Sequence, residues 1–182
     1  MIQLSDFLLD SHLRNQFAGA AVNRLIVSQL SDALRDNHPL SLIMADVDHF
    51  KLYNDSFGHQ QGDECLRAVA RVLGAEARRP GDLVARYGGE EFCIVLPNVD
   101  LEGAKVVAER IRGAVESLGL PRAHPGIGAV VTLSLGVASI VPTALDKPET
   151  LLRHADRELY RAKHLGRNRV LGLQVANASG AA

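Results

Sequence analysis

Two glycines followed by two acids, Gly88-Gly89-Glu90-Glu91, are the residues of this chain best suited to chemistry. They separate an apolar run that ends at Tyr87 from another that begins at Phe92, which predicts a two-residue β-hairpin turn at the glycines. Because glycine lacks a Cβ, a planar base or a phosphate chain can lie against such a turn. Successive strand side chains face opposite ways, so we expect one carboxylate to serve a site and the other to support it or face away. An ordinary charged hairpin is the alternative reading of the glycines alone.

A second pair of acids, Asp46 and Asp48, follows an apolar run that begins near Leu42. Residues two apart on a strand share a face, so the pair is suited to a hard divalent cation, held by few protein oxygens and by substrate phosphates. The sequence therefore predicts that a Mg²⁺ or Mn²⁺ site forms where this strand and the hairpin meet.

Composition narrows the function classes. The chain has 182 residues, 47% of them hydrophobic, which predicts one domain with a real core. Its net charge of −1 disfavours a nucleic acid polymer as partner and favours local phosphate binding, as for a nucleotide. Cys65 and Cys93 lie in apolar runs without metal-ligand spacing, which indicates reduced core thiols in a cytoplasmic protein. No apolar run is long enough to predict a membrane span.

The elements that must position the acids alternate between helix and strand, which predicts an α/β (α+β) fold with a mixed sheet covered by helices. We expect residues 1–38 to form an N-terminal helical segment, 39–174 a single folded domain that carries the acids, and 175–182 a disordered tail. The expected elements are a helix within 1–37, a strand at 41–48, a short helix at 49–55, a helix from Asp63 to about 77, hairpin strands at 83–87 and 91–96, a helix at 104–118, a strand at 130–138, a helix at 148–164 and a short edge strand at 170–171.

Several motifs in fixed order carry a resemblance to a known family. They are Asp46-Val47-Asp48-His49-Phe50-Lys51, Asn54-Asp55 with Phe57-Gly58-His59, Gly62-Asp63, the Gly88–Phe92 hairpin, and Tyr160-Arg161-Ala162-Lys163 before Gly166-Arg167-Asn168. From about residue 40 to 172 the chain resembles the GGDEF family of diguanylate cyclases. The resemblance implies a palm-like, ferredoxin-related fold, in which two GTP molecules, one per subunit, condense to cyclic di-GMP with release of pyrophosphate.

The resemblance also assigns the reaction centre. Asp46, the Val47 carbonyl and Glu90 match the family's metal ligands, and Glu90 is the best candidate for helping to deprotonate the attacking 3′-hydroxyl. Lys51 matches a triphosphate contact and is included among the catalytic residues. Glu91 is the second choice for the base, because strand alternation is expected to turn it elsewhere.

The GTP-binding residues follow from the same motifs. Guanine offers donors at N1 and N2, which suit a carboxylate and an amide oxygen, and Asn54 and Asp63 match those positions. Retention of the acid Asp63 favours a product made from GTP alone. The remaining residues expected around GTP are Phe50, Lys51, His59, Gly88, Gly89, Lys163 and Arg167, with Lys51, Lys163 and Arg167 at the triphosphate; His59 is as well suited to holding its loop as to touching ligand.

A second, inhibitory site for the product is implied by Arg79-Pro80-Gly81-Asp82, which resembles the family's Arg-x-x-Asp motif, together with Arg110. An arginine can grip a guanine edge or a phosphate in bidentate fashion, and an aspartate can accept from guanine N1 and N2. The alternative is a solvated turn with a local ion pair.

One segment departs from the family. Residues 15–24 keep only fragments of the family's Asp-x-Leu-Thr-Gly-Leu-x-Asn-Arg signature, which joins a sensory module to the catalytic domain. We therefore expect a transient or weak homodimer. The chain is either a fragment of a longer regulator or a free-standing domain recruited by an upstream sensory partner. A non-catalytic GTP or cyclic di-GMP receptor acting by protein contact is the alternative function, although such members usually lose acids that this chain keeps. A polymerase-like palm enzyme is disfavoured by the near-neutral charge.

Overall fold

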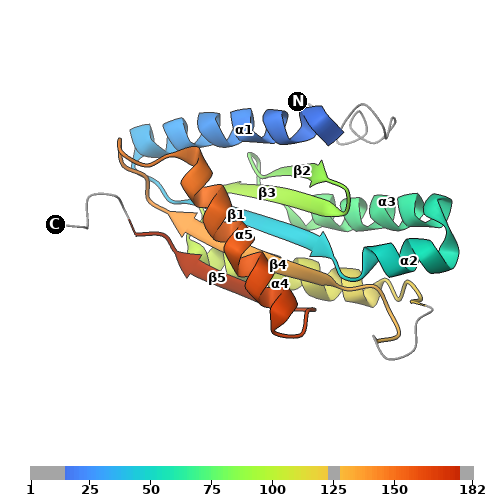
Figure 1. The fold of residues 1–182 in the computed structure, drawn as a ribbon. Helices are drawn as coiled ribbons and strands as arrows, with labels where there is room; N and C mark the ends of the chain where they lie inside the picture. Colours follow the sequence, from blue (N-terminus) through green and yellow to red (C-terminus); the bar gives the residue numbers. More distant parts are fainter. Residues whose placement is uncertain (1–14, 123–127, 177–182) are drawn as a thin grey trace.

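The computed structural model describes residues 15–122 and 128–176, which form a five-stranded sheet flanked by five helices (Figure 1). The elements in chain order are α1 (Asn15–Asp36), β1 (Leu40–Val47), α2 (Phe50–Phe57), α3 (His59–Glu76), β2 (Leu83–Gly88), β3 (Glu91–Pro97), α4 (Leu101–Ser117), β4 (Leu133–Ile140), α5 (Pro148–His164) and β5 (Val170–Gln174).

The sheet has the strand order β2-β3-β1-β4-β5, so the acid-bearing strand β1 is central. β1 runs antiparallel to both β3 and β4, and β2 runs antiparallel to β3. β5 is parallel to β4, to which α5 connects it as a crossover helix. The predicted mixed α/β sheet flanked by helices is therefore confirmed.

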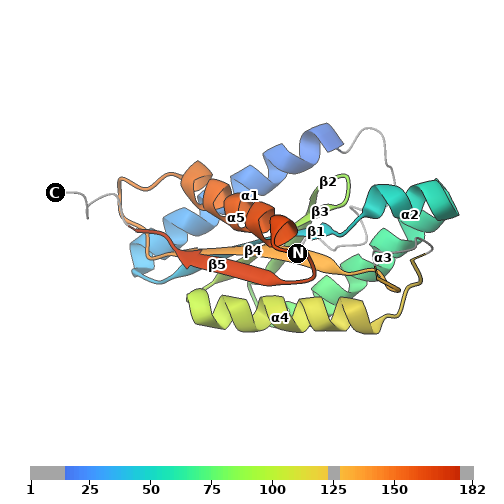
Figure 2. The ribbon, with the colours of Figure 1, turned by 60° about the horizontal axis from the view of Figure 1, so that its bottom comes forward.

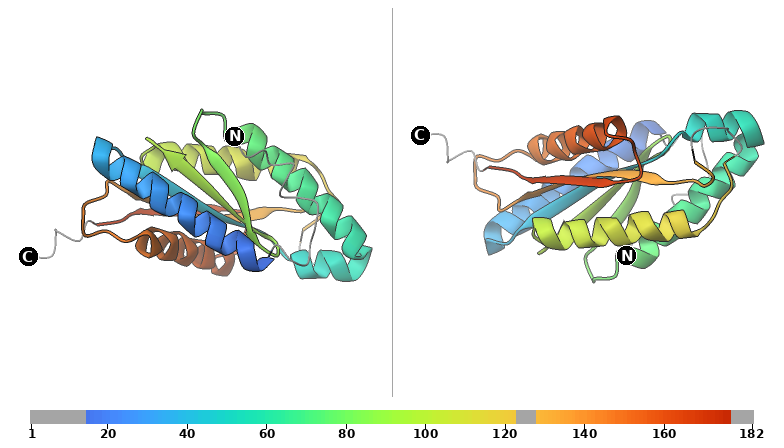
Figure 3. Two further views of the ribbon diagram at one scale, coloured as in Figure 1. Left: turned by 90° about the horizontal axis from the view of Figure 1, so that it is seen from above. Right: turned by 90° about the horizontal axis from the view of Figure 1, so that it is seen from below.

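Helices cover both faces of the sheet. α3 and α4 pack on one face and α1 and α5 on the other, while α2 lies beyond the end of β1 (Figures 2 and 3). Side chains of β1 alternate between the two cores: Ile43, Ala45 and Val47 join the α3/α4 core, whereas Leu42 and Met44 join the α1/α5 core. The same alternation places Asp46 on the face that α5 covers.

Helix α5 approaches the sheet closely because Gly136 of β4 has no side chain. A Cβ at this position would collide with the backbone of α5, at the Ala155 carbonyl oxygen and the Leu159 nitrogen. Close backbone approach of this kind is a usual reason for glycine inside a strand. The absence of a side chain at Gly136 therefore sets the spacing between α5 and β4.

Several element boundaries differ from those expected. α3 begins at His59 rather than Asp63, so the polar residues before Asp63 are helical. α4 begins at Leu101, where the Asp100 side chain caps it by accepting from the Gly103 N–H at 2.8 Å. β4 begins at 133 rather than 130, and β5 continues to Gln174.

The ends of the chain are described only in part. α1 ends at Asp36, close to the predicted end of the first helix, and residues 1–14 lie outside the described residues. Val175, assigned to the tail from sequence, is buried and donates its N–H to the Ser139 carbonyl at 2.8 Å. The rest of the predicted tail, 177–182, also lies outside the described residues.

Both cysteines are free and buried in the core, as predicted. Burial raises the pKa of the Cys65 thiol to about 11 and that of Cys93 to about 12. These shifts describe inert core thiols. Among the helices of residues 15–122 and 128–176, none is long and apolar enough to span a membrane.

Candidate active site

The β2–β3 hairpin turns one residue later than predicted. Gly88 and Glu91 are partners across the hairpin, so the two-residue turn is Gly89-Glu90, not Gly88-Gly89. A register shift between Arg86 and Gly88 inserts Tyr87 as an extra residue in β2, and this bulge displaces the turn. Gly89 has a left-handed φ of 43°, and its carbonyl accepts from Arg86 Nε at 2.7 Å. Glu90 thus lies at the tip of the hairpin rather than inside a strand.

The hairpin tip is tied to the end of the central strand. The Val47 N–H donates to the Glu90 carbonyl at 3.3 Å, and Glu91 lies directly opposite Asp46 in the antiparallel register. The expectation that strand alternation turns Glu91 elsewhere is wrong, because the displaced turn puts Glu91 across from Asp46. Both acids of the hairpin are therefore close to β1.

Two carboxylates, those of Asp46 and Glu91, interact with the Lys163 ammonium at this junction, and Glu90 lies near both of them. Burial, with smaller contributions from the nearby Glu90 and Glu91, raises the pKa of Asp46 to about 6 against the opposing effect of Lys163, whose Nζ lies 2.8 Å from Asp46 Oδ2. Burial also raises the pKa of Glu91, again opposed by Lys163. The local charge is net negative, which favours a bound cation.

The predicted metal ligands suit a hard cation. Asp46 and Glu90 supply carboxylate oxygens and Val47 a carbonyl oxygen, the donor types that Mg²⁺ and Mn²⁺ prefer. Within the described part of the chain, no group of three or more His, Cys, Asp or Glu side chains is arranged to hold a metal ion. The predicted set needs two such side chains and a carbonyl, so substrate phosphates would have to complete the shell.

Beside the acids lies a cavity of about 480 Å³ between the hairpin tip and helices α2 and α3. It contains five of the predicted GTP-binding side chains, and Gly89 and Glu90 close it on the hairpin side. The lining residues are Phe50, Lys51, Asn54, Asp55, His59, Asp63, Leu66, Arg86, Gly89 and Glu90. His59 lies in the first turn of α3 at the cavity wall, not in a glycine-rich loop.

Asn54 and Gly62 form an arrangement suited to binding a ligand donor. The Asn54 Oδ1 atom is buried without a hydrogen-bond partner in the described structure, which is unusual for a polar atom. It lies against Gly62, where a Cβ would collide with it and would also come within 3.2 Å of the Phe50 ring. The glycine therefore makes room for the Asn54 amide oxygen at the cavity wall.

The residues predicted to contact triphosphate come from three places. Lys51 is exposed in the first turn of α2 and lines the cavity, while Lys163 on α5 is half-buried against Asp46. Arg167 lies in the loop between α5 and β5 with a left-handed φ of 62°. Gly88, the remaining predicted contact, is the last residue of β2, adjacent to the turn.

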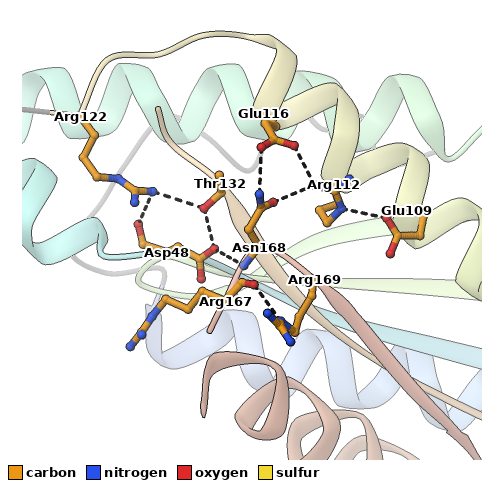
Figure 4. Close-up of polar contacts among 9 residues, drawn as sticks. All are labelled: Asp48, Glu109, Arg112, Glu116, Arg122, Thr132, Arg167, Asn168 and Arg169. Atoms are coloured by element: carbon orange, nitrogen blue, oxygen red, sulfur yellow. Dashed lines mark hydrogen bonds and ion pairs between the residues drawn. The ribbon is translucent and has the colours of Figure 1, made fainter. Parts of the chain in front are cut away.

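Asp48 does not share a site with Asp46, contrary to the prediction. β1 ends at Val47, so the two-residue alternation no longer applies at Asp48. Its carboxylate accepts from Thr132 Oγ1 at 2.7 Å and from the Asn168 N–H at 3.1 Å (Figure 4). It also accepts from Ser134 Oγ at 2.6 Å. Both carboxylate oxygens are occupied by protein donors.

The predicted inhibitory residues lie on the surface around the α3–β2 turn. Asp82 Oδ2 accepts from the Arg79 N–H at 2.9 Å, and Asp82 Oδ1 is buried without a partner in the described structure. Arg110 on α4 donates to the Glu76 carboxylate and carbonyl, both at 3.1 Å. Glu76 also pairs with Arg78 at 2.9 Å, so Arg110 is joined to this turn through one acid.

Three residues of the cavity wall were not predicted from the sequence to belong to the site: Asp55, Leu66 and Arg86. Arg86 is half-buried, and burial lowers its pKa against the opposing effects of Asp63 and Glu90. The alternation of side chains along β2 could have predicted Arg86 as a site residue. Because Arg86 is adjacent to Tyr87, which faces α1, Arg86 must face α3.

Comparisons with known proteins agree with this arrangement. The family model described as "Diguanylate cyclase, GGDEF domain" matches residues 13–169. The chain is 42% identical over 139 residues to the probable diguanylate cyclase DgcT of Escherichia coli, covering 76% of this chain and 30% of that protein. It is 38% identical over 170 residues to diguanylate cyclase VdcA of Vibrio cholerae, covering 92% and 48%. The chain thus spans less than half the length of these two relatives.

Solved structures show the same fold. The GGDEF domain of DgcB from Caulobacter crescentus, solved in complex with c-di-GMP, has a TM-score of 0.75 and 35% identity, covering 85% of this chain and 89% of that one. The active GGEEF domain of a Vibrio cholerae diguanylate cyclase has a TM-score of 0.73 and 33% identity, covering 89% and 97%. The chain therefore belongs to the GGDEF family of diguanylate cyclases.

Proposed function

We propose that this chain is the catalytic domain of a diguanylate cyclase, which condenses two GTP molecules into cyclic di-GMP and releases two pyrophosphates. The observation that carries the proposal is the position of Glu90, which lines the cavity of Asn54 and Asp63 and also acts electrostatically on Asp46. Residues suited to recognising a nucleobase and a cluster of acids thus share one site. Family membership and relatives named as diguanylate cyclases support the same activity.

Guanine recognition is assigned to Asn54 and Asp63. The buried Asn54 Oδ1 needs a donor, and guanine N1–H and N2–H are donors that the Asn54 oxygen and the Asp63 carboxylate can accept. Adenine presents an acceptor at N1, so it would leave one of these oxygens unpaired in a partly enclosed site. This difference supports GTP over ATP as substrate.

Each condensation forms a bond between the 3′-oxygen of one GTP and the α-phosphorus of the other. The bond from that phosphorus to the β-phosphate oxygen breaks, and pyrophosphate leaves with the electron pair. The attacking 3′-hydroxyl must lose its proton, for which Glu90 is the proposed acceptor because it lies at the hairpin tip, where its backbone carbonyl accepts from the Val47 N–H. Glu91 and Lys163 adjust the charge around Asp46.

The family typically uses Mg²⁺, and Asp46, the Val47 carbonyl and Glu90 would hold that ion or Mn²⁺ here. When bound, such a cation neutralises charge that develops on the phosphate oxygens. Lys51, Lys163 and Arg167 provide the remaining positive charge at the triphosphate. The ion pair of Lys163 with Asp46 is the contact that nucleotide and cation would rearrange.

Two subunits are needed for the reaction. Each carries one cavity and one set of acids, and attack of one GTP on another requires a second set opposite, as in a two-fold dimer. We propose a weak or transient homodimer whose assembly depends on an upstream sensory partner. Product bound at Arg79, Asp82 and Arg110 would inhibit by holding the subunits apart.

Incubation of purified protein with GTP and Mg²⁺, followed by chromatography, tests the proposal. We expect cyclic di-GMP and pyrophosphate, with a specific activity that rises with protein concentration. Glu90→Gln is the matched control, since it removes a charge at the half-buried hairpin tip without changing volume, and its rate should fall by far more than about tenfold. GTP binding without product formation would instead support the non-catalytic receptor.

A further inference from the structure

The loop that carries Arg167 has an unfavourable backbone conformation. Gly166, Arg167 and Asn168 are consecutive left-handed residues, with φ of 112°, 62° and 45°. Glycine adopts this region freely, but the other two residues carry a Cβ that crowds the backbone there. Such a conformation persists only where surrounding contacts hold it, and it occurs often at ligand-binding sites.

Asn168 is held from two sides (Figure 4). On one side its N–H donates to Asp48 Oδ2 at 3.1 Å. On the other, its side-chain amide bridges two residues of α4: Nδ2 donates to Glu116 Oε1 at 2.9 Å, and Oδ1 accepts from Arg112 at 2.8 Å. The backbone after Arg167 is therefore fixed between the end of β1 and helix α4.

Asp48 is itself rigidly placed. It is 2% exposed, and its own N–H donates to the Thr132 carbonyl at 3.0 Å. The hydroxyls of Thr132 and Ser134 donate to its two carboxylate oxygens. Asp48 also follows Asp46 by two residues, so the contact to Asn168 links the Arg167 loop to the acid cluster through a short, fixed piece of backbone.

We propose that Asp48 is a positioning residue for the triphosphate: by holding the Asn168 N–H, it fixes the left-handed backbone that presents Arg167. Figure 4 shows the Arg167 side chain extending out of this network, while its carbonyl accepts from Arg169 Nε at 3.0 Å. The role rests on the proposed function, which assigns Arg167 to phosphate. It differs from a role as cation ligand, because both carboxylate oxygens of Asp48 already accept from protein donors.

Binding of 3′-deoxyguanosine triphosphate tests this role, because the probe lacks the attacking hydroxyl and cannot condense. Its affinity is measured by calorimetry with Mg²⁺, and 3′-deoxyguanosine serves as a competitor that lacks phosphate. Asp48→Ala should weaken the triphosphate by about tenfold or more and leave the nucleoside unchanged. In an Arg167→Ala background, Asp48→Ala should have no further effect, since both changes act through the same guanidinium.

Two further variants separate positioning from stability and from metal binding. Thr132→Val removes one donor to Asp48 but leaves the Asn168 contact, so it should lower the melting temperature and weaken triphosphate affinity much less than Asp48→Ala does. Asp48→Asn keeps an oxygen for the Asn168 N–H, and the Ser134 hydroxyl can turn to accept from the new amide. It should restore most of the affinity, which a cation ligand would not allow.

If Asp48→Ala fails to fold, Asn168→Gly replaces it. This variant keeps the N–H and tolerates positive φ but loses both contacts to α4, and it should weaken the triphosphate selectively. Equal losses for triphosphate and nucleoside, or additive effects of Asp48→Ala and Arg167→Ala, would overturn the positioning role alone. A parent protein that binds no guanine nucleotide would overturn the proposed function and this role together.

Discussion

Replacement of Gly62 by alanine adds one methyl group where the structure has no room for it. The new Cβ would overlap Asn54 Oδ1 and come within 3.0 Å of Asn54 Cγ and 3.2 Å of Phe50 Cζ. Asn54 must therefore rotate away from its buried position. In the nucleotide-free protein this movement costs little hydrogen bonding, because Asn54 Oδ1 has no partner there within the described residues.

The expected effects on stability and on binding differ in size. Alanine is favoured over glycine in a helix by up to ~1 kcal/mol, which offsets part of the strain, so stability should change by less than about 1 kcal/mol. A guanine donor left without its acceptor costs ~1–3 kcal/mol. GTP affinity should therefore fall between about fivefold and about 150-fold.

Gly113→Ala on α4 is the matched control, because a Cβ there meets nothing within 4 Å. It should give the same gain in helix propensity with GTP affinity unchanged. Calorimetric titration with 3′-deoxyguanosine triphosphate and thermal unfolding of both variants provide the comparison. Gly62→Ala binding within about twofold of the parent would show that Asn54 does not read the base.

The remaining predictions concern specificity, pH and regulation. Asp63→Ser should relax the choice of base and give mixed cyclic dinucleotides from equimolar GTP and ATP, whereas unchanged selectivity would remove Asp63 from base recognition. Mn²⁺ affinity, followed by the electron spin resonance of the free ion, should fall by about tenfold as pH decreases from about 7 to about 5, because protons compete for Asp46, whose pKa is raised to about 6. Because the pKa of Asp46 is higher in the folded than in the unfolded protein, ionisation of Asp46 destabilises the folded state. Without a cation, the contribution of Asp46 to the free energy of unfolding should therefore decline as pH rises through about 6. Arg79→Ala should weaken both calorimetric binding of cyclic di-GMP and inhibition of initial rates by about tenfold, and equal values for parent and variant would place any product binding elsewhere.

The fold could be predicted where apolar residues repeat with a clear period. Val131, Leu133, Leu135 and Val137 were assigned to one face of a strand, and all four lie in the α3/α4 core. The start of α3 was missed because Gly58 and Gly62 resemble loop residues. Gly62 is helical and is small because Asn54 lies against it, which is a tertiary contact without a local signal.

The sequence predicted which residues form the candidate site better than it predicted how they are arranged. Motif spacing indicated which acids meet, but the bulge at Tyr87 displaced the turn and put Glu91 opposite Asp46. Asp48 was assigned to the wrong group because alternation was extended one residue past the end of β1. Its partners Thr132 and Asn168 are far away in sequence, so only the assembled sheet could bring them together.

The absence of a side chain at Gly136 determines how close α5 lies to the sheet. Lys163 lies one helical turn beyond Leu159, so the depth at which α5 sits on the sheet decides how far the Lys163 ammonium must reach to Asp46. Any larger residue at 136 would lift the helix and lengthen that reach, even though it touches neither charge. The charge balance of the acid cluster is thus sensitive to a single methyl group added beneath α5, on the side of the helix that faces the sheet.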